Sequence, residues 1–368
     1  MSHQRRPLTY YVQTMPGVEK IAWQEIQQRF PQATLGEYLF VKDQNGIVLF
    51  DDDVSFKDLL TLRTAEDVFI RAAHIPRLTY AYGDLRQIER LIQEGDEFGK
   101  ITHILTSYLK LTRRPTFRIV ARKTGDHRYN RAHLEKALEL GIQRRFGKGW
   151  RQVEENADFE VWGNILGPVF LCGIRLSDRT MRHRHNRAIE LPASLRPSVA
   201  AAMVFLSQPH PHDVFLDPMC GSGTILLERL AFGDAQSIRG ADVAPEALRA
   251  TRANLGKKGR QRVQLWLGDG EHLPARTSSV NKIVCNLPFG HQIGTPAQIK
   301  RLYPAFLAEV ARVLRPGGKA VLLSSEFDRL KEAIRQQPSL TIGEGHSIAV
   351  LGKWGRIYVV EKKETMKA

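Results

Sequence analysis

The sequence has few cysteines and no long hydrophobic run. Its 368 residues include three cysteines, at positions 172, 220 and 285, and their spacing forms neither a disulfide framework nor a zinc motif. No apolar run approaches the ~20 residues that a membrane-spanning helix needs. The first residues are not followed by the apolar core of a signal peptide. We therefore expect a cytoplasmic protein with no membrane span and no metal site.

Acidic residues are scarce relative to basic ones. Lys and Arg number 54 against 39 Asp and Glu, a formal net charge of +15 with an isoelectric point near 9.8. Such an excess attracts polyanions, chiefly nucleic acid, without specifying what is recognised. Basic residues crowd the middle of the chain, where Arg offers planar bidentate donors to phosphates. The predicted RNA-binding residues are Arg113, Arg114, Arg122, Lys123, Arg128, Arg144, Arg145, Arg182, Arg184 and Arg187.

The stretch Val214–Leu227 has the pattern of a strand, a glycine loop and a helix. No Lys follows Gly223, which argues against a nucleoside-triphosphate loop, and Leu226 occupies the place of the third glycine of a dinucleotide fingerprint. Asp217, at the predicted strand end, suits a ligand with an amine or sulfonium charge. S-adenosylmethionine carries both, together with a carboxylate that a helix N-terminus can bind. The stretch therefore predicts an S-adenosylmethionine site.

Strands and helices alternate from Ser198 onward, which predicts a doubly wound parallel sheet with ligands at the carboxyl ends of its strands. The last two strands, His346–Leu351 and Arg356–Glu361, form a hairpin that adds an antiparallel strand. Two acidic residues follow the second and third strands. Asp242 can accept hydrogen bonds from ribose hydroxyls or cap the next helix, and Asp269 can receive the adenine amine or form a turn.

Asn286-Leu287-Pro288-Phe289-Gly290 ends the fourth predicted strand. The Asn286 amide oxygen and the Leu287 carbonyl can accept N–H bonds from an exocyclic amine, and Phe289 can stack on the base. We predict Asn286, Leu287, Pro288 and Phe289 as catalytic residues. Cys285 alternates away from Asn286 and should pack in the core, which argues against a cysteine nucleophile. The predicted cofactor-binding residues are Asp217, Cys220, Gly221, Gly223, Thr224, Asp242, Val243, Asp269, Gly270 and Asn286.

The N-terminal half has a different pattern. Residues 1–62 have the order β-α-β-β-α, which predicts a small ferredoxin-like domain, and residues 63–178 predict a second α+β unit that ends in a hairpin across Gly167. Residues 179–197 read as a basic linker, in which His183 and His185 lack partners at metal-ligand spacing. Residues 198–368 form the alternating α/β domain, and we expect the fragment 188–368 to fold and bind the cofactor by itself.

Several motifs together resemble one protein family. Asp217–Thr224, Asn286–Gly290 and Leu314–Gly318 are similar to the THUMP-domain class of Rossmann-fold RNA methyltransferases, as are Pro16–Glu19 and Leu195–Ser198 nearer the N-terminus. The resemblance implies a THUMP RNA-binding domain at 63–178 and methyl transfer from S-adenosylmethionine to the N2 amine of a guanosine in tRNA. Members with this Asn-Leu-Pro-Phe-Gly motif most resemble the enzymes that act on guanosine 6 of the acceptor stem.

Three other functions stay open at this point. They are a guanosine-N2 methyltransferase of ribosomal RNA, an adenine-amine DNA methyltransferase, and a non-catalytic RNA-binding protein. The separate basic N-terminal region argues against the DNA enzyme, and the complete set of polar positions argues against a vestigial site. We expect a monomer that binds structured RNA.

Overall fold

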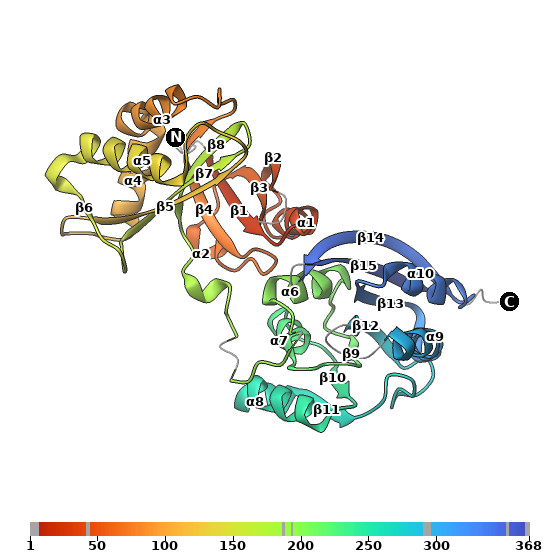
Figure 1. Ribbon diagram of the computed structural model, residues 1–368. Coiled ribbons are helices and arrows are strands. Elements are labelled where there is room, and N and C mark those ends of the chain that lie inside the picture. The colour runs from red at the N-terminus through yellow and green to blue at the C-terminus, as the bar shows by residue number, and fades with distance from the viewer. Residues whose placement is uncertain are drawn as a thin grey trace. The chain divides into compact units, whose positions relative to one another are not determined.

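The computed structural model describes residues 7–41, 45–185, 188–192, 194–289, 296–350 and 353–364. The chain divides into two compact units, and each contains a β-sheet (Figure 1). Unit 1 comprises Met1–Gln13, Ile26–Leu62 and Asp67–Asp178, and unit 2 comprises Thr14–Glu25, Arg63–Glu66 and Arg179–Ala368. Unit 2 therefore includes two short segments from the N-terminal part of the sequence.

Unit 1 is built on an eight-stranded sheet with the order β2-β3-β1-β4-β8-β7-β5-β6. Its strands are β1 (Leu8–Thr14), β2 (Thr34–Val41), β3 (Asn45–Asp52), β4 (Asp67–Ile75), β5 (Thr116–Thr124), β6 (Arg151–Gln152), β7 (Phe159–Leu166) and β8 (Val169–Arg175). Its helices are α2 (Phe56–Leu59), α3 (Gly83–Glu94), α4 (Asp96–Tyr108) and α5 (Arg131–Phe146), and α1 (Glu19–Arg29) runs from unit 2 into unit 1.

The two α+β regions expected from the sequence share this sheet. Strand β1 pairs antiparallel with β4, so that Tyr10 lies opposite Ile70. The expected hairpin across Gly167 is present as β7 and β8, with Gly167 in the left-handed region at φ 59°. The separation into a ferredoxin-like and a THUMP domain stays a prediction, because strand pairing runs without a break through both.

Unit 2 contains a seven-stranded sheet with the order β11-β10-β9-β12-β13-β15-β14. Its strands are β9 (Val214–Asp217), β10 (Ser237–Asp242), β11 (Val263–Leu267), β12 (Val280–Asn286), β13 (Leu314–Ser324), β14 (Leu340–Val350) and β15 (Lys353–Lys362), and its helices are α6 (Pro197–Leu206), α7 (Thr224–Ala231), α8 (Pro245–Arg262), α9 (Pro296–Val313) and α10 (Phe327–Arg335). The first five strands in this order pair in parallel, which confirms the predicted doubly wound sheet.

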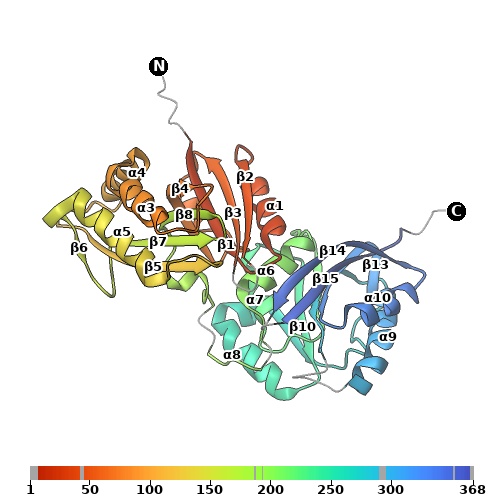
Figure 2. The same ribbon diagram turned by 45° about the horizontal axis from the view of Figure 1, so that its top comes forward.

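Two details of this sheet differ from the expectation. The closing hairpin contributes two antiparallel strands, and the later one, β15, lies between β13 and β14 (Figure 2). The Leu314–Gly318 motif, whose proline and paired glycines are typical of a turn, belongs to the start of β13. Val280 pairs with Leu314 but Lys282 pairs with Lys319, so a bulge absorbs the turn residues, and Gly317 adopts φ 72° there.

The two faces of the sheet pack against separate apolar layers. Successive strand residues face opposite layers, as Phe215 packs beneath α6 and α7 whereas Leu216 packs toward α9 and α10. Cys285 faces the second layer and is fully buried, and burial raises its thiol pKa well above the usual value, as expected for a core residue. Figure 1 shows α9 and α10 together beside the sheet.

A segment from the N-terminal part of the sequence completes the first apolar layer. Val18 and Ile21 are fully buried in it, together with residues of α6 and β14. The Ala349 amide donates to the Pro16 carbonyl at 2.9 Å. A side chain at Gly17, whose φ is 93°, would meet the Ser347 carbonyl at 2.0 Å, so this position requires glycine.

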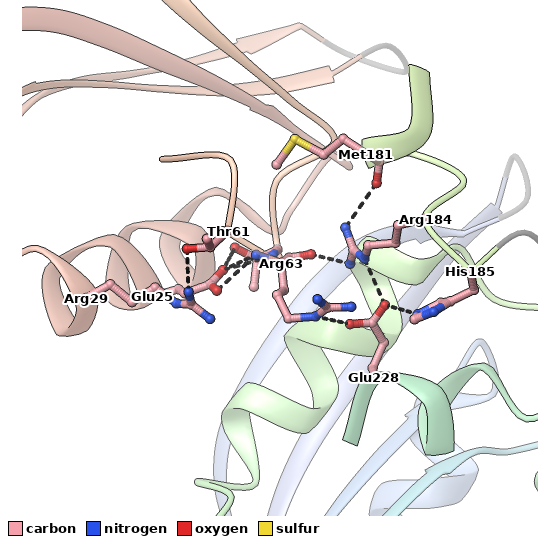
Figure 3. Close-up of polar contacts among 9 residues, drawn as sticks. Glu25, Arg29, Thr61, Arg63, Met181, Arg184, His185 and Glu228 are labelled. Atoms are coloured by element: carbon pink, nitrogen blue, oxygen red, sulfur yellow. Dashed lines mark hydrogen bonds and ion pairs between the residues drawn. The ribbon is translucent and has the colours of Figure 1, made fainter. Parts of the chain in front are cut away.

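Glu228, a buried carboxylate on α7, binds side chains from two other segments of the chain (Figure 3). Glu228 is fully buried, and its oxygens lie 2.7 Å from Arg63 Nε, 2.9 Å from Arg184 Nε and 2.5 Å from His185 Nε2. Burial alone would raise the pKa of Glu228. The hydrogen bond from His185 and the charges of Arg184 and Arg63 outweigh burial and lower this pKa to about 2.

Arg63 is itself held in place, because its amide donates to Glu25 Oε1 at 3.0 Å. The expected independence of the fragment 188–368 therefore does not agree with the structure. That fragment lacks Val18 and Ile21 and leaves Glu228 without its three cationic or hydrogen-bonding partners.

Candidate active site

A cavity of about 740 Å³ opens at the carboxyl ends of β9, β10, β11 and β12 in unit 2. This is where a doubly wound sheet is expected to bind ligands, and the volume is in the range of ligand pockets. Every predicted catalytic and cofactor-binding residue lines this cavity except Gly223: Asp217, Cys220, Gly221, Thr224, Asp242, Val243, Asp269, Gly270, Asn286, Leu287, Pro288 and Phe289.

The glycine loop has the backbone shape that its sequence predicts. Gly221 and Gly223 both have positive φ, at 53° and 83°, and Gly223 is the N-cap of α7. A side chain at Gly223 would meet Thr251 Cγ2 at 2.9 Å, whereas the space beside Gly221 is open. The Cys220 amide donates to the Ala241 carbonyl at 2.9 Å. The loop is thus fixed to the end of β10 and leaves room for a ligand against Gly221.

Asp217 is a buried carboxylate of the cavity with an unsatisfied oxygen. Its side chain is 1% exposed, Oδ2 has no hydrogen-bond partner, and Oδ1 accepts only a long bond of 3.4 Å from the Met219 amide. Burial raises the pKa of this carboxyl well above its usual value, and the nearby Asp242 charge adds to the rise. A cationic ligand would relieve both effects. The cavity therefore fits S-adenosylmethionine, whose amine and sulfonium are cationic.

Asp242 orders the backbone as well as facing the cavity. Its Oδ2 accepts from the Gly221 amide at 2.8 Å and its Oδ1 from the Ala244 amide at 3.0 Å, just before α8 begins. The alternative role of Asp242, capping of the next helix, is thus partly present, because its Oδ1 accepts from the Ala244 amide. An ionised carboxylate has about four acceptor sites, so two remain for ribose hydroxyls. The next residue, Val243, is 71% exposed at the cavity.

Asp269 forms the turn that was the alternative to adenine binding. Its Oδ1 accepts from the Glu271 amide at 2.9 Å, and its carbonyl accepts from the His272 amide at 3.0 Å. Asp269 and Gly270 nevertheless line the cavity. An adenine contact for Asp269 stays a prediction.

The Asn286 motif begins where β12 ends. Asn286 Oδ1 is buried and has no hydrogen-bond partner, and the Leu287 amide donates to the Leu323 carbonyl at 3.0 Å. Phe289 is half-buried and packs partly against the apolar layer that includes Val350. Gly290 lies outside the described residues. The motif therefore places a buried amide acceptor without a partner at a residue that lines the cavity, whereas stacking by Phe289 stays a prediction.

Seven further cavity residues were not predicted individually: Ser194, Ser222, Glu246, Glu271, Gln298, Arg301 and Lys353. Ser222, Glu246 and Glu271 lie within or just after the predicted strand-end loops, whereas Ser194, Gln298, Arg301 and Lys353 come from segments that reach the site only in the folded sheet. Ser194 and Ser222 hydroxyls lie 2.9 Å apart. Arg301 Nε lies 3.3 Å from Glu271 Oε1, and the Arg301 side chain is 79% exposed.

The predicted RNA-binding residues of unit 1 have different surroundings. Arg114 and Arg128 are exposed and make no ion pair with any described residue. Arg145 instead donates to carbonyls at the end of α3, including that of Gln93 at 2.8 Å. Several others make contacts within the unit: Arg113 with Asp158, Arg144 with Glu89, Arg122 over the Trp162 ring, and Lys123 with the Gly125 carbonyl.

The predicted RNA-binding residues of the linker belong to unit 2. Arg184 is 12% exposed and paired with Glu228, which leaves little of its guanidinium for a phosphate. Arg187 lies outside the described residues, and an RNA contact for Arg182 stays a prediction. Within the described part of the chain, no cluster of His, Cys, Asp and Glu could hold a metal ion, and no helix is long and apolar enough to cross a membrane.

Comparison with known proteins agrees with this geometry. Residues 184–346 match the UPF0020 family, described as an RMKL-like methyltransferase domain. A Thermus thermophilus protein named tRNA (guanine(6)-N2)-methyltransferase is 25% identical over 352 residues, which cover 95% of this chain and 98% of that protein. The Bos taurus protein named tRNA (guanine(6)-N(2))-methyltransferase THUMP3 is 33% identical over 225 residues, 57% of this chain but 44% of the bovine protein.

The fold of the whole chain is similar to a solved structure as well. The crystal structure of TrmN from Thermus thermophilus superposes with a TM-score of 0.77 at 24% identity and covers 96% of this chain and 99% of that one. At this identity the likeness shows the fold. Taken with the matched domain and the cavity at its strand ends, it confirms the predicted fold class and enzyme class. The chain is therefore an S-adenosylmethionine-dependent methyltransferase, and its residues 184–346 match the UPF0020 methyltransferase domain.

Proposed function

We propose that this enzyme methylates the exocyclic N2 amine of a guanosine in tRNA, and specifically guanosine 6 of the acceptor stem. The observation that carries the proposal is the buried Asn286 Oδ1, which has no hydrogen-bond partner at the edge of the cavity. Leaving a buried acceptor unsatisfied costs about 1–3 kcal/mol, and an amine donor supplied by the substrate would satisfy it. Two relatives named as tRNA (guanine(6)-N2)-methyltransferases support the choice of base and position.

The chain's own residues orient the amine. Asn286 Oδ1 and the Leu287 carbonyl accept its two N–H bonds, which draws electron density toward the nitrogen and aims its lone pair into the cavity. Bound S-adenosylmethionine supplies an electrophilic methyl group. Asp217 holds the cationic part of the cofactor, and the remaining acceptor sites of Asp242 hold its ribose.

Recognition of the RNA is assigned to the exposed cations. Arg114 and Arg128 of unit 1 are exposed, and guanidinium groups in that state can contact phosphates. The net charge of +15 supports attraction to RNA at long range. A monomeric state and a cytoplasmic location remain part of this proposal.

The test uses the purified full-length chain, labelled S-adenosylmethionine and unmodified tRNA transcripts. We expect N2-methylguanosine at position 6, detected by mass spectrometry of nuclease fragments, and no product from a transcript in which position 6 is adenosine with a compensating partner. Asn286→Ala should abolish most transfer and leave cofactor affinity near normal, because in the proposed geometry its amide oxygen accepts from the base, whereas Asp217 and Asp242 supply the polar contacts to the cofactor.

Other outcomes discriminate among related substrates. A Bos taurus relative, 32% identical over 238 residues, is named U6 snRNA (guanine-N(2))-methyltransferase THUMPD2, so a U6 transcript belongs in the assay, together with a ribosomal RNA fragment. Methylation of either one in preference to tRNA would contradict the tRNA assignment and leave guanine-N2 chemistry intact.

A further inference from the structure

Tyr303 connects the Asn286 motif to the end of another strand. The residue lies on α9, is 1% exposed, and was not singled out by the sequence. Its hydroxyl is 2.9 Å from the Pro288 carbonyl oxygen and 2.7 Å from Ser324 Oγ at the end of β13. Ser324 is fully buried, and its Oγ accepts from the Glu326 amide at 2.8 Å.

The donor and the acceptor of each hydrogen bond between Pro288, Tyr303, Ser324 and Glu326 follow from the chemistry of the groups. The Pro288 carbonyl has no hydrogen to give, so the single Tyr303 hydroxyl hydrogen is donated to it. The Tyr303 oxygen then accepts from Ser324, and the Ser324 oxygen accepts from the Glu326 amide. Burial raises the pKa of Tyr303, so its hydroxyl stays protonated at neutral pH. Hydrogen bonds aligned in one direction polarise one another.

This arrangement engages one backbone donor and one backbone acceptor of the motif and leaves Asn286 Oδ1 without a partner. The Pro288 carbonyl is used by Tyr303, and the Leu287 amide is used by the Leu323 carbonyl at 3.0 Å. The two fixed groups lie on either side of the Leu287 carbonyl along the backbone. Among the polar groups of Asn286 and Leu287 that face the target amine in the proposed function, Oδ1 and this carbonyl are the acceptors.

We propose that Tyr303 is a positioning residue for methyl transfer, which holds the Pro288 peptide so that the Leu287 carbonyl and Asn286 Oδ1 converge on the amine. The inference rests on the proposed function for the identity of the amine. Tyr303 does not touch the substrate and acts through the backbone of the motif. A misplacement of about 1 Å in reacting groups can cost about 100-fold in rate, so the hold on this peptide controls kcat.

Tyr303→Phe is the test, since it removes the hydroxyl and keeps the ring. We expect kcat to fall about 10- to 100-fold, whereas the Kd for S-adenosylmethionine and the KM for RNA stay within about twofold, because neither ligand contacts Tyr303 in the proposed geometry. Active sites are counted by cofactor titration, so a fraction of unfolded protein does not count as lost kcat.

Tyr358→Phe is the matched control. Tyr358 lies in the same apolar layer as Tyr303 and is 3% exposed, and its hydroxyl makes no hydrogen bond with any described residue. It should have the kcat of the wild type. If Tyr303→Phe has the same kcat per active site as Tyr358→Phe, the positioning role is wrong and the hydroxyl serves stability alone.

Ser324→Ala separates the effects of the two hydrogen bonds that the Tyr303 hydroxyl makes. It removes the donor to Tyr303 but leaves the Tyr303 hydrogen on the Pro288 carbonyl, so we expect a smaller loss of kcat than in Tyr303→Phe. The double variant should have the kcat of Tyr303→Phe alone, because the connection is already cut. If the two losses of kcat multiply in the double variant, Ser324 does not act through Tyr303 and the proposed series of hydrogen bonds is wrong.

The design distinguishes failure of this inference from failure of the proposed function. The ratio of variant to wild-type kcat can be measured on whichever RNA and base the wild type methylates. Hydrogen exchange supplies a readout without substrate: amides of the segment 286–289 should exchange faster in Tyr303→Phe than in Tyr358→Phe. Equal exchange in both variants would overturn the inference even if tRNA guanosine proves to be the substrate.

Discussion

Two carboxylates in one strand-helix unit are equally buried but differ in their hydrogen-bond partners and in the direction of their pKa shifts. Asp217 ends β9 and Glu228 lies on α7, and their side chains are 1% and 0% exposed. Glu228 has three partners that lower its pKa to about 2, after burial alone would have raised it. Asp217 has an oxygen without a partner and a pKa raised well above the usual value by burial.

The difference shows how to separate structure from function in this unit. A buried charge without a partner is costly, so a carboxylate oxygen that has no partner and also lines a cavity is a place where a ligand can supply the partner. Asp217 lines the cavity and Glu228 does not. Glu228 therefore organises the chain around α7, and we infer that Asp217 faces the cationic part of a ligand.

The largest effect should come from removing the partners of Glu228 together and leaving Asp217 intact. The fragment 188–368 lacks Arg63, Arg184 and His185, and it lacks Val18 and Ile21 of the apolar layer. We expect it to lose cooperative folding, as measured by circular dichroism during heating, and to lose cofactor binding with it. A fragment that melts cooperatively and binds S-adenosylmethionine like the full chain would show that Glu228 needs no partner.

Glu228→Ala should cost less than truncation but more than an ordinary substitution. It leaves two arginines in a partly buried site without their carboxylate, and breaking a buried pair typically costs about 3–5 kcal/mol of unfolding free energy. Unfolding by denaturant measures this loss of stability. Asp234→Asn is the control, since Asp234 pairs with Arg262 at the surface and is 87% exposed, where a pair is worth about 0–1 kcal/mol. If both variants lose the same free energy of unfolding, Glu228 is no more important for stability than a surface carboxylate.

The two carboxylates should also respond to pH with opposite signs. The pKa of Glu228 is lower in the folded protein than in the unfolded chain, so its stabilisation is complete above about pH 4.5 and is lost as the pH falls toward 2. The stability advantage of wild type over Glu228→Gln should shrink by about 3 kcal/mol across this window.

The Asp217 pKa is raised, so ionisation of Asp217 destabilises the fold as the pH rises above the usual carboxyl range. Unfolding curves of the wild type and Asp217→Asn across pH measure this. The stability of Asp217→Asn relative to wild type should increase with pH. A relative stability that decreases with pH would contradict the raised pKa.

The smallest change is expected from Asp217→Asn at neutral pH, and it should separate stability from binding. The amide keeps the acceptor for the Met219 N–H and removes the buried charge, so Tm should equal or exceed that of the wild type. Affinity for S-adenosylmethionine should fall by about 1.5–3 kcal/mol, the usual worth of a hydrogen bond to a charged group. Calorimetry measures the binding, and unchanged affinity would remove Asp217 from the site.

Much of the catalytic unit could be predicted from local patterns. The alternation after Ser198 predicted the parallel sheet, and the residues at strand ends predicted Asp217, Asp242 and Asn286 as cavity residues, because parallel strands bring their carboxyl ends to one edge. The secondary role of Asp242 at the start of α8 was also open in the sequence. The bulge at the start of β13 was not, since it depends on the register with Val280.

The sequence by itself determined the order of the strands and helices in unit 2, the glycine loop and the polar groups that follow each strand, because these depend on neighbours within a few residues. Only the tertiary structure decided that Val18 and Arg63 belong to the catalytic unit. It also decided that Arg184 pairs with Glu228 and not with solvent, and that Tyr303 reaches the Pro288 carbonyl. These contacts join residues far apart in the chain, and no local pattern records which distant side chain will meet a buried charge or an open carbonyl.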